Sequence, residues 1–115
     1  IYESMIKFSG ATPIPIPLNE AQGFSFRAES ILEKIKPSTR LIIINSPSNP
    51  TGGVIPEGEL EILANGLISY PHVAILSDEI YSRIYYRKKK PASLLKFEQI
   101  RDRLIVLDGW SKTYA

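Results

Sequence analysis

Four polar side chains of different chemical types follow the ends of three apolar segments of the sequence. They are an amide, a carboxylate, a phenol and a primary amine, belonging to Asn49, Asp78, Tyr81 and Lys112. A primary amine can bind an aldehyde covalently, and a carboxylate can keep a basic ring nitrogen protonated. Because open α/β folds bind ligands at the carboxyl ends of parallel strands, the sequence predicts one site that contains all four side chains.

The apolar patterns predict the elements that position these side chains. Continuous apolar runs predict strands at 41–45, 73–77 and 104–108. An apolar stripe over 60–68 predicts a helix whose first turn contains Pro56 and which Pro71 ends. Strand, helix, strand, connection, strand is typical of a mostly parallel sheet with right-handed crossover helices. The uninterrupted apolar strands also predict that both faces of the sheet are covered. We therefore expect an α/β fold, with residues 1–115 forming one segment without an internal domain boundary.

Proline and glycine positions predict the path of the chain before the first strand. The apolar pattern from Tyr2 to Ile6 predicts a helix, which Gly10 is placed to end. Prolines alternate along 12–18, so this segment must be an edge strand or lie outside the sheet. A short helix is expected over 31–35.

Composition excludes several classes of function. The sequence has no cysteine and a single histidine, His72, which excludes thiolate chemistry and multi-histidine metal sites and argues against a serine–histidine triad. A net charge of +2 without a basic stripe argues against binding of nucleic acid, and Lys88–Lys90 is interpreted as a solvated loop. No apolar run approaches the length of a membrane span and no signal-peptide pattern opens the chain, so a cytoplasmic protein is expected.

Taken singly, two of the candidate residues have ordinary structural interpretations. Lys112 could be a surface lysine, although its aromatic neighbours Trp110 and Tyr114 could partly bury the amine, as covalent catalysis by lysine requires. Asp78 could cap the turn after its strand or pair with Arg83. The functional interpretation of each residue therefore depends on the others.

The remaining candidates lie in segments that are common in proteins. A turn of helix from Asp78 to Tyr81 would place the carboxylate and the phenol on one face. Residues 45–53 are rich in Pro, Asn and Gly, which are usual in loops. The bond between Asn49 and Pro50 could be cis, which would bend the loop sharply and aim the Asn49 side chain.

One kind of ligand would use all four side chains at once. It would carry a basic ring nitrogen for the carboxylate, a ring oxygen for the phenol and the amide, and an aldehyde for the amine. Pyridoxal phosphate is such a molecule, and a covalent lysine with an aspartate on the ring nitrogen is its usual protein setting.

Three stretches of sequence resemble a known family in order and spacing. They are Asn45-Ser-Pro-Ser-Asn-Pro-Thr-Gly52, Ser77-Asp-Glu-Ile-Tyr81 and Gly109-Trp-Ser-Lys-Thr-Tyr-Ala115, and the opening segment 1–18 agrees as well. The chain resembles the middle of the large domain of class I/II, aspartate-type aminotransferases, which are fold-type I pyridoxal-phosphate enzymes. The resemblance covers essentially all of this chain but well under half of a family member.

The resemblance implies a role for each candidate residue. Asn49 and Tyr81 resemble the residues that contact the cofactor's ring oxygen, Asp78 resembles the aspartate that pairs with the pyridinium nitrogen, and Lys112 resembles the lysine that binds the cofactor covalently. Gly109 departs from the family, which often has a phosphate-contacting serine there. The departure implies weaker anchoring of the phosphate from this side, or anchoring by a backbone amide.

The implied function is transfer of an amino group between an amino acid and a 2-oxo acid, in a protein that forms a homodimer. The chain begins with Ile1 and ends without a polar tail, so we expect a segment of a longer enzyme that is inactive by itself. Two alternatives stay open: another pyridoxal-phosphate reaction on the same fold, such as that of a lyase or synthase, and a cofactor-sensing regulator domain. A generic nucleotide-binding domain is disfavoured because neither G-x-G-x-x-G nor G-x-x-x-x-G-K-[ST] occurs.

Overall fold

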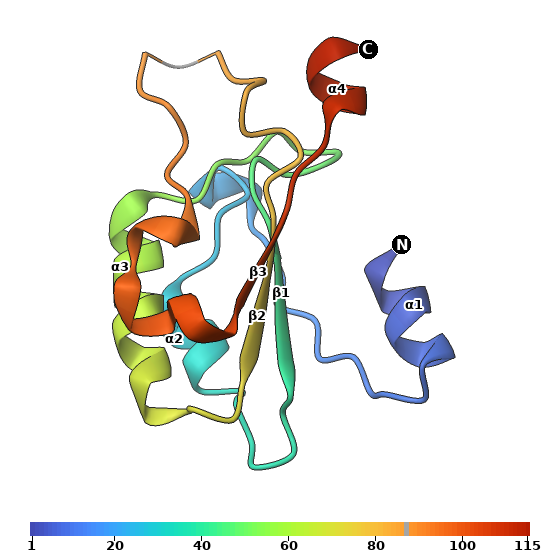
Figure 1. Cartoon of the computed structure of the whole chain (residues 1–115), viewed down its shortest axis with the longest axis vertical. Helices are drawn as coiled ribbons and strands as arrows, with labels where there is room; N and C mark the ends of the chain where they lie inside the picture. Colours follow the sequence, from blue (N-terminus) through green and yellow to red (C-terminus); the bar gives the residue numbers. More distant parts are fainter. Residues whose placement is uncertain (87) are drawn as a thin grey trace.

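The computed structural model describes residues 1–86 and 88–115, and its centre is a parallel sheet of three strands. The strands lie side by side in the order β1 (Leu41–Asn45), β2 (Ala74–Asp78) and β3 (Leu104–Leu107) (Figure 1). Both pairings are parallel, so the connections between strands cross from one end of the sheet to the other. The predicted α/β fold is confirmed, with strand bounds that differ from the expected ones by a residue at most.

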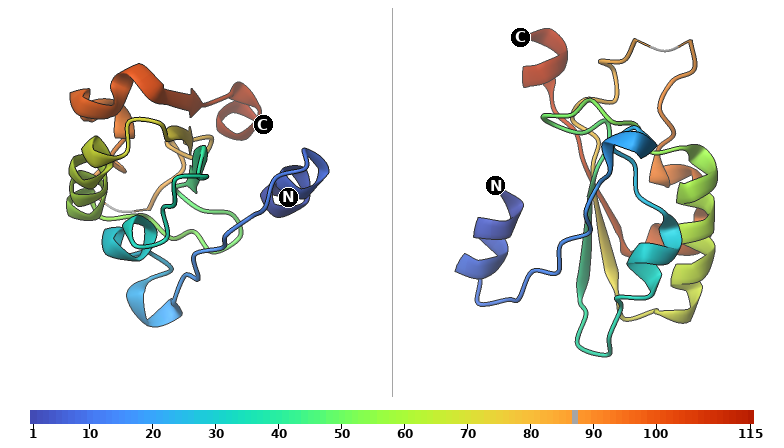
Figure 2. Two further views of the ribbon diagram at one scale, coloured as in Figure 1. Left: turned by 90° about the horizontal axis from the view of Figure 1, so that it is seen from below. Right: turned by 180° about the vertical axis from the view of Figure 1, so that it is seen from behind.

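Helices α2 (Ala28–Leu32) and α3 (Glu57–Gly66) cover one face of the sheet (Figure 2). Pro56 immediately precedes α3, where its missing N–H removes no helical hydrogen bond, and the 3-10 helix η2 (Leu67–Ser69) continues it. α2 begins before the expected residue 31 because Glu59 of α3 accepts a hydrogen bond from the N–H of its first residue. Apolar side chains from both helices and the sheet form the core, which includes Ile31, Ile44, Leu60, Leu63, Leu67 and Ile75.

Among the described residues, the opposite face of the sheet meets only the N-terminal part of the chain. α1 (Tyr2–Phe8) lies on this side (Figure 2). The proline-containing segment 12–18 then passes the edge of β1, so that Ile16 packs against the core, and it forms no strand, as its prolines predict. Leu41, Ile105 and Leu107 remain 44%, 51% and 42% exposed. The prediction that both faces are covered is therefore wrong within the described chain. Most side chains on this face are apolar, and among the described residues α1 leaves them partly exposed.

The connection from β2 to β3 is fixed at its end by one half-buried guanidinium group. It runs through the 3-10 helices η3 (Leu94–Lys96) and η4 (Glu98–Arg103). Arg103 donates hydrogen bonds at 2.7–2.8 Å to the carbonyl oxygens of Leu67, Tyr70 and Val73, where the chain leaves α3 and enters β2. This cluster fixes the start of β3 beside the start of β2. No helix in the described part of the chain is long and apolar enough to cross a membrane.

Two lysines of the same connection hold the first residue of α3. The ammonium of Lys89 lies 2.7 Å from Glu57, and Lys96 pairs with the same carboxylate. Hydrogen bonds and charge from these lysines lower the pKa of Glu57 to about 2. The carboxylate therefore stays ionised at the positive end of the α3 dipole. The side chains of Lys88–Lys90 are exposed, as expected for a solvated loop.

Candidate functional site

The central strand β2 ends in Asp78, which lies in the middle of the candidate site. Asp78 is opposite Asn45 of β1 and Leu107 of β3, so the three strands end at one rim. Asn45 joins the strand ends: its Nδ2 donates to the carbonyl oxygen of Asp78 at 3.2 Å, and its Oδ1 accepts from the N–H of Asn49 at 3.0 Å. The strand register therefore brings the backbones of two predicted site residues to the same place.

A second contact joins the loop after β1 to the turn after β2. Asn49 Nδ2 donates to the Tyr81 hydroxyl oxygen at 3.2 Å. Residues 78–81 do not form the expected turn of helix; hydrogen-bonded turns follow β2 instead, with the N–H of Ser82 donating to the Glu79 carbonyl oxygen at 2.8 Å. The turns still carry Tyr81 to Asn49, so the amide and the phenol meet although the helical geometry is absent.

The Asp78 carboxylate accepts one hydrogen bond on each oxygen. Oδ1 accepts from the N–H of Ile80 at 3.2 Å, and Oδ2 accepts from the Tyr2 hydroxyl at 2.5 Å. Through the first bond, Asp78 caps the turn after β2, which is one of the two structural roles considered above. Asp78 does not pair with Arg83, whose guanidinium donates to the Tyr114 hydroxyl at 3.1 Å. The second bond comes from a residue that the sequence analysis did not connect with this site.

Lys112 lies at the same end of the sheet but does not contact the other three residues. It belongs to α4 (Trp110–Tyr114), which stands beyond the carboxyl ends of the strands (Figure 1). Trp110 is 82% exposed and Lys112 is exposed too, so within the described chain the aromatic neighbours do not bury the amine. No hydrogen bond or ion pair joins Lys112 to any other described residue.

Gly109, where the family often has serine, packs against the turn after β2. A Cβ at this position would lie 2.9 Å from Ile80 Cδ1, so the bare backbone allows β3 to pass close to that turn. Its N–H already donates to Asp108 Oδ1 at 2.7 Å.

The loop that carries Asn49 is folded tightly on itself. Ser46–Pro47 and Asn49–Pro50 are cis, the latter as the sequence analysis proposed. Ser48 accepts from the N–H of Gly52 at 2.7 Å and donates its own N–H to the carbonyl oxygen of Gly53 at 3.0 Å. These contacts give the Asn49 side chain a defined direction.

Gly53 closes this loop against the segment before α2, and we expect Gly53→Ala to destabilise the protein. An added Cβ would lie 2.7 Å from the Phe24 carbonyl oxygen and 2.9 Å from that of Gly23, so backbone would have to move. Thermal or urea unfolding should show a loss of about 1–3 kcal/mol. Gly58→Ala is the matched control, because nothing lies within 4 Å of its Cβ and alanine favours the helix. Equal stability of the two variants would contradict this packing.

Glu79 is a buried carboxylate next to Asp78, and its role was also missed in the sequence analysis. Its buried Oε1 accepts from Ser77 Oγ at 3.0 Å, Ser93 Oγ at 2.9 Å and the N–H of Leu94 at 3.2 Å. The carboxylate therefore ties the end of β2 to the start of η3. The sequence could not reveal this role, because two adjacent acidic residues, Asp78 and Glu79, do not show which of them is buried.

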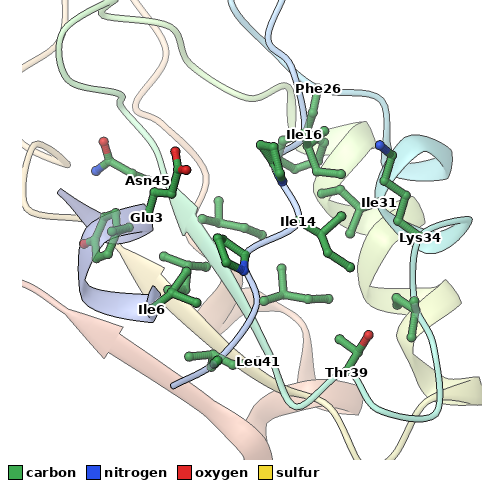
Figure 3. A pocket seen from close by; sticks show the side chains of 18 of the residues that line it. Glu3, Ile6, Ile14, Ile16, Phe26, Ile31, Lys34, Thr39, Leu41 and Asn45 are labelled. Carbon is green, nitrogen blue, oxygen red and sulfur yellow. The ribbon is translucent and has the colours of Figure 1, made fainter. Parts of the chain in front are cut away.

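A separate hollow of about 900 Å³ lies between α1, segment 12–18 and β1 (Figure 3). Ile14, Ile16 and Leu41 are among its mostly apolar lining side chains, and Asn45 lies on its wall. None of Asn49, Asp78, Tyr81 and Lys112 lines it. The hollow therefore adjoins the candidate site without containing its polar groups.

Fold and site together define an open α/β domain that presents polar groups at the carboxyl ends of its strands. The family described as aminotransferase class I and II matches residues 1–115. The chain therefore belongs to the class I and II aminotransferase family.

Individual relatives agree with the family assignment. An aspartate aminotransferase of Pinus pinaster is 36% identical over 114 residues, covering 99% of this chain and 23% of the relative. A probable aspartate/prephenate aminotransferase of Aquifex aeolicus is 34% identical over 115 residues, covering 99% of this chain and 29% of the relative. Among solved structures, the aspartate aminotransferase of Rhizobium meliloti superposes with a TM-score of 0.90 at 30% identity, over 98% of this chain and 28% of that one. The chain thus spans about a quarter of the length of these relatives.

Proposed function

We propose that residues 1–115 act within a longer polypeptide, as part of the cofactor-binding domain of a pyridoxal-phosphate-dependent aminotransferase. The observation that carries the proposal is the arrangement at the sheet rim. An amide–phenol pair, Asn49 with Tyr81, is joined through Asn45 to the carboxylate-bearing end of the central strand. The family assignment supports an amino-transfer reaction over a lyase or a sensor domain, since the relatives described above are aminotransferases.

The hydrogen-bonding groups at the rim suit pyridoxal phosphate. Asp78 accepts two hydrogen bonds in the described chain, and a carboxylate can accept about four, so it has capacity for a protonated ring nitrogen. Asn49 uses one amide hydrogen on Tyr81, which leaves its other amide hydrogen and the Tyr81 hydroxyl hydrogen for a ring oxygen. When bound, pyridoxal phosphate supplies an aldehyde and an electron-withdrawing ring that stabilises negative charge at the substrate Cα.

The side chains of this chain then have distinct tasks. Asp78 keeps the proton on the ring nitrogen, which makes the ring a better acceptor of electrons. Asn49 and Tyr81 orient the ring through its oxygen. Lys112 Nζ would hold the cofactor aldehyde as an imine, with loss of water, in the absence of substrate, and in its presence the freed amine would move the proton at the substrate Cα. Lys112 must approach the other three residues for this chemistry.

We propose an amino acid and a 2-oxo acid as substrates, and a cytoplasmic homodimer as the working form. The test is to incubate the purified full-length protein with pyridoxal phosphate, 2-oxoglutarate and single amino acids, aspartate and aromatic amino acids first, and to analyse the products. We expect glutamate to form in equal amount to the 2-oxo acid derived from the donor. Decarboxylation or elimination products, without glutamate, would assign the fold to a different reaction. Cofactor binding without any turnover would favour a sensor.

A further inference from the structure

Tyr2 reaches the candidate site from outside the sheet. It is the first residue of α1, and its hydroxyl donates to Asp78 Oδ2 at 2.5 Å across a sequence separation of 76 residues. The Ile80 N–H holds the other oxygen of the same carboxylate at 3.2 Å. Two donors on two different oxygens fix both the position of the carboxylate and the direction of its plane.

The chemistry of the Tyr2 hydroxyl suits a permanent donor. Burial, the hydrogen bond to Asp78 and the negative charge of Asp78 raise the pKa of Tyr2 to about 12. The phenol therefore keeps its proton throughout the neutral and mildly basic range and can only donate to the carboxylate. A hydrogen bond to an ionised acceptor is stronger than one between neutral groups, so it can hold a side chain in one orientation.

The rest of α1 contributes no buried side chain among the described residues. Met5 and Phe8 are 58% and 96% exposed. The helix thus contributes little core, while its first residue makes a short bond to the carboxylate at the centre of the rim.

We propose that Tyr2 is a positioning residue of the cofactor site, whose hydroxyl holds Asp78 in the orientation in which the carboxylate receives the protonated ring nitrogen. This inference rests on the proposed function, because it assigns Tyr2 a task through Asp78. Oδ2 has a second lone pair, so it accepts the ring N–H without losing Tyr2. Tyr2 touches neither substrate nor cofactor in this role.

The test measures cofactor binding and the state of the ring nitrogen in the full-length protein. Tyr2→Phe removes the hydroxyl and keeps the ring, and Tyr70→Phe, at a half-buried tyrosine far from the rim, is the matched control. We expect Tyr2→Phe to weaken binding of pyridoxal phosphate about 10-fold, as the loss of a hydrogen bond to a charged group predicts. The nitrogen NMR signal of isotope-labelled cofactor should also move, whereas Tyr70→Phe should leave both quantities unchanged.

The outcomes separate this inference from the proposed function. If Tyr2→Phe lowers the unfolding temperature but binds the cofactor like the wild type, with an unmoved ring-nitrogen signal, Tyr2 only anchors α1 and the inference fails alone. If the wild type binds no pyridoxal phosphate, or Asp78→Asn binds it unchanged, the proposed function fails and the inference with it. Should Tyr2→Phe not fold, 3-fluorotyrosine at position 2 keeps the shape and changes the acidity of the hydroxyl. The ring-nitrogen signal must then move, and an unmoved signal overturns the inference.

Discussion

Lys112→Ala in the full-length protein is expected to lower the rate of amino-group transfer by about 10⁴-fold, the upper end of what a positioned proton-transfer group contributes. The proposed role of Lys112 gives it two tasks, covalent attachment of the cofactor and movement of the proton at Cα, and alanine performs neither. The rate is measured as glutamate formed from 2-oxoglutarate at saturating cofactor. Weak binding of the cofactor alone would be overcome at saturation, so the remaining loss reports the chemical step.

The matched control for this prediction is Lys36→Ala, which removes another exposed lysine distant from the strand ends. Borohydride treatment followed by peptide mass analysis adds a second readout, because reduction makes a covalent cofactor–lysine link permanent. The cofactor mass should appear on the peptide that contains Lys112 in the wild type and in Lys36→Ala, and it should be missing in Lys112→Ala. Attachment to a different lysine, or activity within a few-fold of the wild type, would rule out Lys112.

The sequence predicted the sheet well because its signal is local. Each strand is a run of apolar residues bounded by turn residues. These runs alternate with helical segments or long connections, which leaves few arrangements other than a parallel sheet. Among the described residues, one face of the sheet is covered only in part, contrary to the prediction for both faces. The apolar character of Ile105 and Leu107 indicates that burial of these side chains is favourable. It does not indicate which segment of the fold covers them.

The site was predictable where parallel pairing brings residues together. Asn49 and Tyr81 are 32 residues apart, yet each follows a strand end, and neighbouring parallel strands place such residues at one rim. Tyr2 was missed for the opposite reason. It lies in a helix outside the sheet, so no strand register links it to Asp78. The strands do not fix the direction of α4 either, which is why the separation of Lys112 from the other three residues could not be deduced.

Asp78→Asn is the second substitution with a large expected effect, a loss of about 10²–10³ in the rate of amino-group transfer. Asparagine keeps the shape of the side chain and can still accept from Tyr2, but it carries no negative charge to hold a proton on the ring nitrogen. The ring then withdraws electrons less strongly when the proton leaves Cα. A single-turnover reaction of the cofactor-loaded protein with an amino acid isolates this step from product release. Asp102→Asn, at an exposed aspartate of η4, should react at the wild-type rate.

A cofactor with a permanent charge on the ring nitrogen tests whether the loss has this electrostatic cause. Pyridoxal phosphate methylated at that nitrogen stays positive without any carboxylate, so it should restore part of the rate in Asp78→Asn. It should restore nothing in Lys112→Ala, where the group that moves the proton is missing. If the methylated cofactor rescues neither variant while binding to both, Asp78 acts by holding the fold of the rim, through Tyr2 and Ile80, and the charge on the ring is not its contribution. The amide oxygen of asparagine can keep one of those two contacts and alanine can keep neither, so Asp78→Ala should then be much the slower of the two aspartate variants.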